Sequence, residues 1–235
     1  MELNYGFMVD TFFVALKGLP TTLGLTALSL FLAVPIAFYM AVVRMNESPV
    51  AGRLTALYIS FVRGTPIILQ ILLIYSLLPS LLHSWATSLG LGVNVFDDID
   101  PIVYACVVFT LNTIAVLSEV FRSALLSIPK GQLEAGLATG ISAFKTYLHV
   151  IVPQAMVVAI PGISNVTVNL VKGTSLAFLM TVKDVMAMAR IEAAYGYNYI
   201  EAYLDVFVVY IIICTIVQLL YDGAERYFGR FRTAG

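Results

Sequence analysis

Long runs without a charged residue dominate the pattern of hydrophobic and polar positions. The first spans residues 18–43, and four more follow at 64–96, 101–118, 146–171 and 206–221. A helix needs about 20 mostly apolar residues to cross a membrane, whereas strands of a membrane barrel are about ten residues long and alternate polar with apolar positions. The pattern therefore predicts an all-α membrane protein with five transmembrane helices, at about residues 18–43, 56–79, 101–122, 146–182 and 203–223.

The amino-acid composition agrees with this prediction, and we expect residues 1–235 to form a single transmembrane domain. Of the 235 residues, 60% are hydrophobic and 11% are charged, whereas soluble domains carry about 25% charged residues. The mean hydropathy of +0.93 requires much of the surface to face lipid. A soluble enzyme is thereby excluded, and a net charge of −1 offers no basic surface to nucleic acid.

The sequence also lacks the motifs that would make this chain an enzyme. It contains no glycine-rich loop ending in Lys-Ser or Lys-Thr, the pattern that binds ATP phosphates. Its two histidines, His83 and His149, are far apart and show no metal-ligand spacing. We therefore expect no cofactor or metal in this chain, and if ATP drives the protein, a partner chain must bind it.

The distribution of Lys and Arg predicts the orientation, because short cytoplasmic loops are enriched in both residues. With the N-terminus outside, three basic residues lie outside: Lys17, Lys183 and Arg190. Nine then lie on the cytoplasmic side: Arg44, Arg53, Arg63, Arg122, Lys130, Lys145, Arg226, Arg230 and Arg232. We therefore predict an N-out, C-in topology, with residues 1–17 forming an amphipathic helix on the outer surface.

A polar cytoplasmic segment separates the third and fourth spans. Pro129 can open a short helix, and Gly140 is a plausible stop. A second short helix over residues 142–150 would be capped by Ser142 and would end before Pro153. Small residues on the first helix would let another surface approach closely. A plain interfacial helix-turn-helix explains the same spacing.

The residues of this segment resemble the EAA loop of ABC-importer permease subunits. Glu134-Ala135-Gly136 is followed after three residues by Gly140 and after nine more by Val-Ile-Val-Pro153. The family pattern reads Glu-Ala-Ala, three residues, Gly, nine residues, Ile-x-Leu-Pro. This chain differs by Gly136 in place of the second Ala and by two valines, all small or apolar exchanges.

Three further segments resemble the polar amino-acid subfamily, the His/Glu/Gln/Arg/cystine permeases. They are Phe-Val-Arg63-Gly-Thr-Pro-Ile-Ile-Leu-Gln70, Ser-Glu119-Val-Phe-Arg122 and Asn169-Leu-Val-Lys172-Gly-Thr174-Ser175-Leu. Members of the subfamily often carry an acidic or amide residue where this chain has Gly173. The resemblance covers about residues 18–228 and implies the type I importer fold with five helices per subunit.

The resemblance also implies an assembly in a bacterial-type inner cell membrane. Two permease subunits, identical or sister chains, would form the path, an ABC ATPase dimer would hold ATP and Mg²⁺, and an extracytoplasmic binding protein would deliver a polar amino acid. A coupling helix in the loop at 129–150 would dock on the ATPase, with the anchor residues Glu134, Ala135, Gly136, Gly140 and Pro153. Cystine or another sulfur amino acid is an alternative substrate. A secondary transporter without an ATPase is the alternative of another class.

The fourth span contains the strongest candidates for the substrate path. Pro161 should bend or break this span. After it, Asn165, Asn169 and Lys172 share one helix face, where they could bind an amino acid or join helices to one another. The remaining path candidates are Thr174, Ser175, Glu119, Arg63 and Gln70. Glu119 can pair with Arg122 on its own helix, and Lys172 is a second candidate partner for it.

Overall fold

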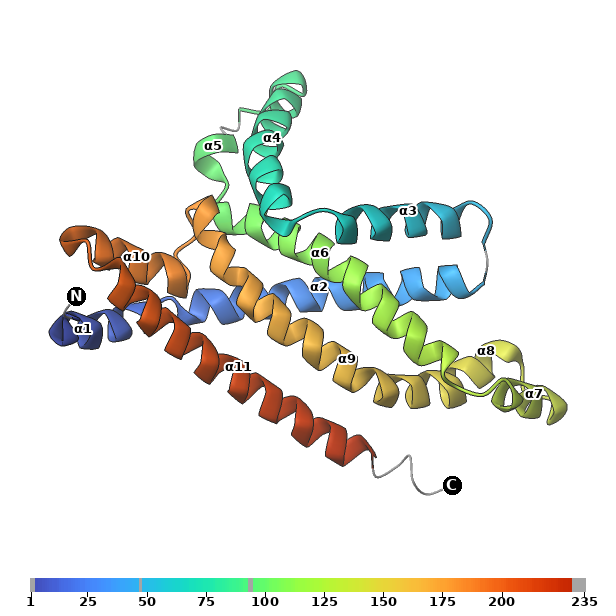
Figure 1. The fold of residues 1–235 in the computed structure, drawn as a ribbon. Coiled ribbons are helices and arrows are strands. Elements are labelled where there is room, and N and C mark those ends of the chain that lie inside the picture. The colour runs from blue at the N-terminus through green and yellow to red at the C-terminus, as the bar shows by residue number, and fades with distance from the viewer. Residues whose placement is uncertain (1–2, 47, 93–94, 230–235) are drawn as a thin grey trace.

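The computed structural model describes residues 3–46, 48–92 and 95–229, and this part of the chain folds into helices without any strand (Figure 1). The α-helices are α1 Tyr5–Leu16, α2 Leu19–Met45, α3 Ala51–Gly64, α4 Ile67–Ser88, α5 Val95–Asp98, α6 Pro101–Leu126, α7 Gly131–Ala138, α8 Ala143–Thr146, α9 Val152–Gly173, α10 Val185–Gly196 and α11 Tyr199–Gly229. A π-turn, η1 Tyr147–Ile151, precedes α9, and a 3-10 helix, η2 Thr174–Met180, follows it.

Five helical segments within the described residues are long and apolar enough to cross a membrane. They are Tyr5–Met45, Ile67–Ser88, Pro101–Leu126, Ala143–Met180 and Tyr199–Gly229. The prediction of an all-α protein with five transmembrane helices is therefore confirmed. The first, third and fifth predicted spans fall within these segments, which extend beyond them at one or both ends.

Helix α6 lies at the centre of the molecule, between α2 and α9 (Figure 1). Three alanines of α2, Ala33, Ala37 and Ala41, are fully buried at a spacing of four residues. Leu117 and Phe121 of α6 belong to the same buried cluster. Small residues on one face let two helix backbones approach closely, which is how membrane helices gain packing contacts without a hydrophobic driving force. The stripe of alanines thus explains why the contact between α2 and α6 is more extensive than that of any other described helix pair.

The second predicted span, 56–79, differs from the structure, which places two separate helices there. Helix α3 ends at Gly64, and Thr65 is extended with a ψ angle of 139°. Pro66 causes this break, because the residue before a proline is driven out of the helical conformation and proline itself has no N–H to donate. The second candidate span is therefore α4, which points away from the body of the molecule (Figure 1).

Of the two predicted effects of Pro161, a bend or a break of the fourth span, the structure excludes the break, because α9 continues through this residue. Gly162 has no side chain, and Val120 of α6 occupies the space where a Cβ atom at position 162 would lie. The helix type changes just before Pro153, where the π-turn ends at Ile151 and α9 begins at Val152. A π-turn gives the backbone extra room, which relieves the clash that proline makes with the carbonyl four residues before it.

The two N-terminal helices meet the α10–α11 corner in a buried polar contact. Asp184 caps α10 by accepting a hydrogen bond from the Ala187 N–H at 2.8 Å, and the Tyr210 hydroxyl donates to its second oxygen at 3.4 Å. Gly18, between α1 and α2, lies directly against the Asp184 backbone, where any Cβ atom would collide. The predicted N-terminal helix exists as α1, and it packs on α10 and α11.

Candidate substrate path and ATPase-coupling site

The segment after α6 forms a short, sharply ended helix. Helix α7 stops as predicted at Gly140, whose φ angle of 81° is the left-handed conformation that glycine adopts without strain. The Gly140 N–H donates to the Leu137 carbonyl and the Ile141 N–H to the Gly136 carbonyl, both at 3.0 Å. These two bonds are the Schellman arrangement that satisfies the last carbonyls of a helix. Ser142 then caps α8, as predicted, by accepting a hydrogen bond from the Lys145 N–H at 3.5 Å.

Helix α7 turns one face toward the protein and presents the other to solvent. Leu133 packs against the main core cluster, whereas Glu134, Ala135 and Leu137 are exposed. The exposed face is therefore the one available to another protein. Pro153 lies outside α7, in the first turn of α9, and is also exposed.

The small residues of α7 were predicted to leave room for another surface, and at Gly136 this room is filled from within the chain. The buried side chain of Thr146, on α8, occupies the space into which a Cβ atom at position 136 would point. The glycine thus accommodates a neighbouring helix of its own chain. This contact fixes α8 against α7.

Glu119 is the centre of an ion-pair cluster where α2 and α6 lie together. Arg122 donates to Glu119 Oε2 from Nε at 3.1 Å, which agrees with the predicted pairing on one helix face. The second partner is Arg44, near the end of α2, whose guanidinium contacts Glu119 Oε1. Lys172, the other candidate partner, makes no ion pair with Glu119 in the described structure. Sequence reasoning missed Arg44, because 75 positions separate it from Glu119 and no local spacing connects them.

The polar face predicted on α9 is present, and among the described residues its side chains have no hydrogen-bond or ion-pair partner. Asn165, Asn169 and Lys172 are all exposed. Thr174 is fully buried, and its hydroxyl donates to the Val171 carbonyl at 2.6 Å, so it points into the protein. The Ser175 hydroxyl donates to the Lys172 carbonyl at 2.7 Å and is partly exposed.

One predicted path residue, Asn169, lines a small cavity between α4, α6 and α9, and a second, Gln70, is hydrogen-bonded to another residue of its wall. The cavity has a volume of about 130 Å³, and its wall includes Asn112, Asn169 and Gly173. Asn112 donates to the side-chain oxygen of Gln70 at 3.4 Å. The Gln70 amide nitrogen contacts the Val62 and Thr65 carbonyls and the Thr65 hydroxyl. Gln70 therefore caps the broken end of α3 and also reaches the cavity through Asn112.

The other predicted path residues lie elsewhere. Lys172 and Ser175 line a separate hollow of about 440 Å³, which Tyr210 and Cys214 of α11 close from the other side. Arg63 is exposed in the last turn of α3 and lines neither space. The structure thus places the predicted path residues along α9 and its neighbours and does not gather them into one pocket.

A polar seam between α9 and α11 was not predicted. The Ser164 hydroxyl donates to the side-chain oxygen of Gln218 at 3.2 Å, and Gln218 donates to Asp222 at 2.8 Å. One turn further along α9, the Thr167 and Tyr221 hydroxyls lie 2.9 Å apart. The polar residues at 218, 221 and 222 share a face at helical spacing, a signal that could have identified the seam.

Comparison with known proteins identifies the family. Residues 33–231 match the family described as "Binding-protein-dependent transport system inner membrane component". The "Probable amino-acid permease protein YxeN" of Bacillus subtilis (strain 168) is 34% identical over 95% of this chain and 95% of that protein. The "L-cystine transport system permease protein TcyB" of the same strain is 34% identical over 91% of this chain and 86% of that protein.

A histidine/lysine/arginine/ornithine transport system permease protein, HisM of Escherichia coli (strain K12), is 32% identical over 89% of this chain and 86% of that protein. Among solved structures, "an amino acid ABC transporter with histidines" contains a chain with the same fold, at a TM-score of 0.80 and 24% identity, covering 97% of this chain and all of that chain. The chain therefore belongs to the family of inner membrane components of binding-protein-dependent transport systems, which are ABC-transporter permease subunits and not enzymes themselves.

Proposed function

We propose that this chain is the permease subunit of an ATP-driven importer for polar amino acids. The names of its relatives support this function, since YxeN is called a probable amino-acid permease and TcyB and HisM are named for L-cystine and for histidine, lysine, arginine and ornithine. ATP and Mg²⁺ would bind to a separate ATPase, and an extracytoplasmic binding protein would deliver the substrate. The bacterial relatives support a location in the inner cell membrane.

The proposed orientation is N-out and C-in. It places the α2–α3 turn, the end of α6, α7 and the C-terminal end of α11 on the cytoplasmic side, which agrees with the excess of Lys and Arg in these segments. Helix α7 would then contact the ATPase through its exposed face, with Glu134 and Ala135 in the contact. A short helix fixed at both ends can move as one body when the ATPase closes.

The observation that carries the proposed path is the exposed polar face of α9. Asn165, Asn169 and Lys172 lie on a helix that is apolar enough to cross a membrane. A lysine in the centre of a bilayer costs roughly 2.5–3.5 kcal/mol on insertion scales, so such a residue faces protein or water. A second permease subunit facing this helix would enclose a polar path. Amide and ammonium groups suit the carboxylate and ammonium of an amino acid.

Substrate-stimulated ATP hydrolysis tests the proposed function. The chain would be produced with the ATPase and binding protein encoded beside it, reconstituted in lipid, and supplied with cystine and the polar amino acids one at a time. Stimulation by one of them supports the function and names the substrate, including the choice between cystine and a cationic amino acid. An assembled complex that no amino acid stimulates would exclude this substrate class. Transport without any bound ATPase would favour a secondary transporter.

A further inference from the structure

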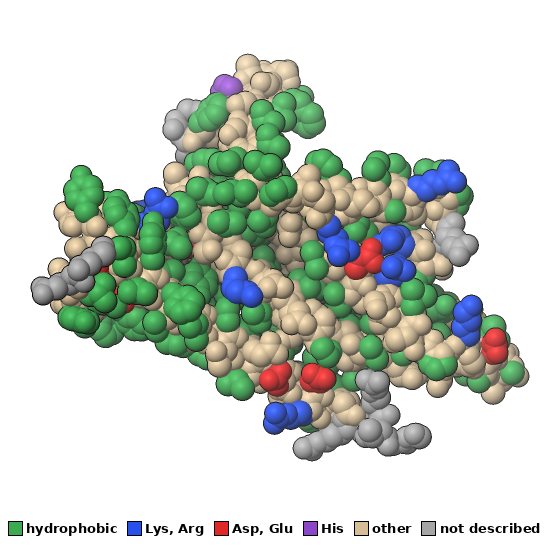
Figure 2. All heavy atoms as spheres, in the orientation of Figure 1, with side chains coloured by type: hydrophobic (Ala, Val, Ile, Leu, Met, Phe, Trp, Pro, Cys, Tyr) green, Lys and Arg blue, Asp and Glu red, His purple; other side chains and the backbone are tan. Residues whose placement is uncertain are grey.

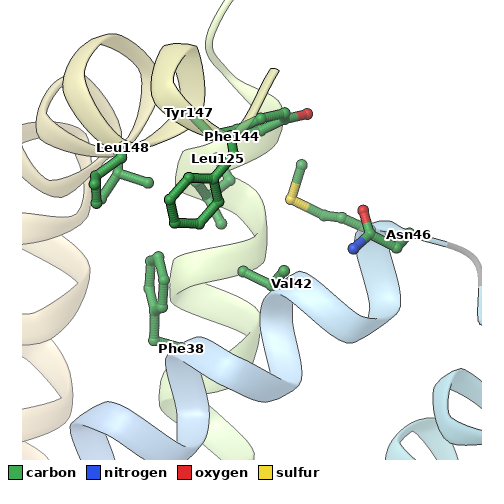
Figure 3. A pocket seen from close by; sticks show the side chains of 9 residues that line it. Phe38, Val42, Asn46, Leu125, Phe144, Tyr147 and Leu148 are labelled. Carbon is green, nitrogen blue, oxygen red and sulfur yellow. The ribbon is translucent and has the colours of Figure 1, made fainter. Parts of the chain in front are cut away.

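An apolar groove opens where α2, α6 and α9 reach the same end of the molecule. Its floor is formed by Phe38 and Val42 of α2, Leu125 of α6 and Val152 of α9, and its volume is about 320 Å³. Figure 3 shows the Phe38 ring on α2 and the Phe144 ring above it, both bordering this space. The volume is within the range of about 300–1,000 Å³ that is typical of small-molecule sites.

The groove lies at the depth where the membrane-spanning helices end. Helix α2 ends at Met45, α6 ends at Leu126, and α9 begins at Val152, so the groove is lined by the last two turns of α2, the end of α6, the start of α9 and the segment that precedes α9. This is the level at which the hydrocarbon of a bilayer meets its headgroup region. An apolar groove at this level is within reach of the lipid chains of the bilayer.

Polar groups are confined to one side of the groove. Figure 3 shows the Asn46 amide and the Tyr147 hydroxyl on the same side, away from Phe38 and Leu148. The exposed Lys145 is in α8, the helix that also provides Phe144. The opening therefore offers hydrogen-bond donors beside an apolar channel, and Lys145 follows one of its lining residues, Phe144, in the sequence.

Basic side chains outnumber acidic ones among the described residues at this end of the molecule, where Lys130 balances Glu134 (Figure 2). Arg44 precedes Met45 of the groove by one position, and Arg122 lies one turn before Leu125. Both guanidiniums share the single carboxylate of Glu119, which leaves one positive charge uncompensated within this cluster. Lys145 adds a second. Basic pockets between membrane helices on the cytoplasmic side bind anionic lipid headgroups.

We propose that this groove binds one acyl chain of an anionic phospholipid, with the phosphate held by Lys145, Asn46 and Tyr147. The lipid would wedge between α2 and the α8–η1 segment that connects α7 to α9. The proposal uses the orientation given above but does not depend on the transported substrate. The lipid site and the proposed transport function can therefore be disproved separately.

Fluorescence quenching by brominated lipids tests the proposal in the complex of permease and ATPase. The single tryptophan is removed by Trp85→Phe, and Phe144→Trp introduces a fluorescent reporter into the wall of the groove. Nanodiscs contain brominated phosphatidylglycerol or brominated phosphatidylcholine in increasing proportion. Phe228→Trp on α11 is the matched control, because Phe228 is partly exposed and lies outside the groove. Leu148→Trp provides a second reporter if the first variant folds poorly.

We expect brominated phosphatidylglycerol to quench the groove reporter half-maximally at a lipid fraction about fivefold lower than brominated phosphatidylcholine requires. One lysine near the membrane surface provides a preference of about this size for an anionic lipid. Lys145→Gln should abolish this preference, and the control reporter should show none. Equal quenching by both lipids at the groove reporter would overturn the proposal. Protection of that reporter from both lipids would also overturn it, because the ATPase would then cover the groove.

Discussion

The Thr146 side chain packs into the space that any side chain at position 136 would need. Gly136 and Thr146, ten residues apart, are therefore sterically complementary. Thr146 is fully buried, and its hydroxyl donates to the Ser142 carbonyl at 3.1 Å. The contact connects α7, which carries the proposed ATPase-contacting face, to α8 and thus to α9. The family pattern has an alanine where this chain has Gly136, and the structure explains how this chain accommodates the difference.

This pairing predicts that the destabilisation caused by Gly136→Ala depends on the residue at position 146. In the wild-type background the added methyl group overpacks the site and should cost about 1–3 kcal/mol. With Thr146→Ala the two nearest atoms are removed and only the Cβ of residue 146 remains, 3.1 Å from the added methyl group, so most of this cost should disappear, helped by the better helix propensity of alanine. Thermal unfolding of the four variants of this cycle measures both effects. Equal effects in both backgrounds would show that the two residues do not interact.

The two arginines that pair with Glu119 should contribute unequally to the stability of the protein. Arg44→Gln should reduce stability by about 1–2 kcal/mol, a value below that of a fully buried pair because both side chains are 21–23% exposed. Arg122→Gln should cost less, about 0.5 kcal/mol, because its pair lies within one helix. Lys172→Gln is the control, since Lys172 is not part of the cluster. A larger loss for Arg122→Gln than for Arg44→Gln in thermal unfolding would contradict this ranking.

Gln70 should stabilise the protein by capping the end of α3 at its break with α4. Gln70→Met keeps the size of the side chain but leaves the Val62 and Thr65 carbonyls without their donor, at an expected cost of about 1–3 kcal/mol. Asn112→Leu removes only the long hydrogen bond to Gln70 and should cost less. Comparing the two variants by thermal unfolding separates the capping role from the cavity contact. If Asn112→Leu proved the more destabilising, the capping role would be wrong.

Asp184 predicts a pH dependence of stability. Burial raises the pKa of its carboxyl group from 3.8 to about 6, against the opposing effect of hydrogen bonds from the Ala187 and Met186 N–H groups. The folded protein therefore binds this proton more tightly than the unfolded chain. Its contribution is full below pH 4 and is lost as the pH rises through 6, by about 3 kcal/mol in total.

Asp184→Asn should remove this fall in stability, because asparagine still caps α10 but does not ionise. Denaturant unfolding at several pH values between 4 and 7 measures the difference. Asp100→Asn is the matched control, since Asp100 caps α6 in the same way but is exposed. If Asp184→Asn retained the wild-type pH dependence, another group would be responsible.

Local signals in the sequence predicted much of the fold and of the coupling segment. The apolar runs predicted the five spans, Gly140 predicted the end of α7, and Ser142 predicted the cap of α8. The spacing of Glu119 and Arg122 predicted their ion pair. Each of these features depends on residues a few positions apart, where helix geometry is known in advance.

Features that depend on distant packing could not be predicted in the same way. Pro66 ends a helix and Pro161 does not, and the contact of Gly162 with Val120 is visible only in the folded chain. Arg44 and Glu119 meet because α2 and α6 pack together. The separation of Asn169 and Lys172 into different hollows depends on how α4, α6 and α11 surround α9.

Coupling through α7 is the central claim of this account, and a pair of glycines tests it directly. Gly140 and Gly90 both have positive φ angles, of 81° and 69°, and neither has another group near the position of an added Cβ atom. Gly140→Val and Gly90→Val therefore introduce the same kind of backbone strain at the coupling segment and beyond the end of α4. The measurement is substrate-stimulated ATP hydrolysis by the reconstituted complex. We predict that Gly140→Val abolishes the stimulation and that Gly90→Val retains it. Full stimulation of the Gly140→Val complex would contradict the claim.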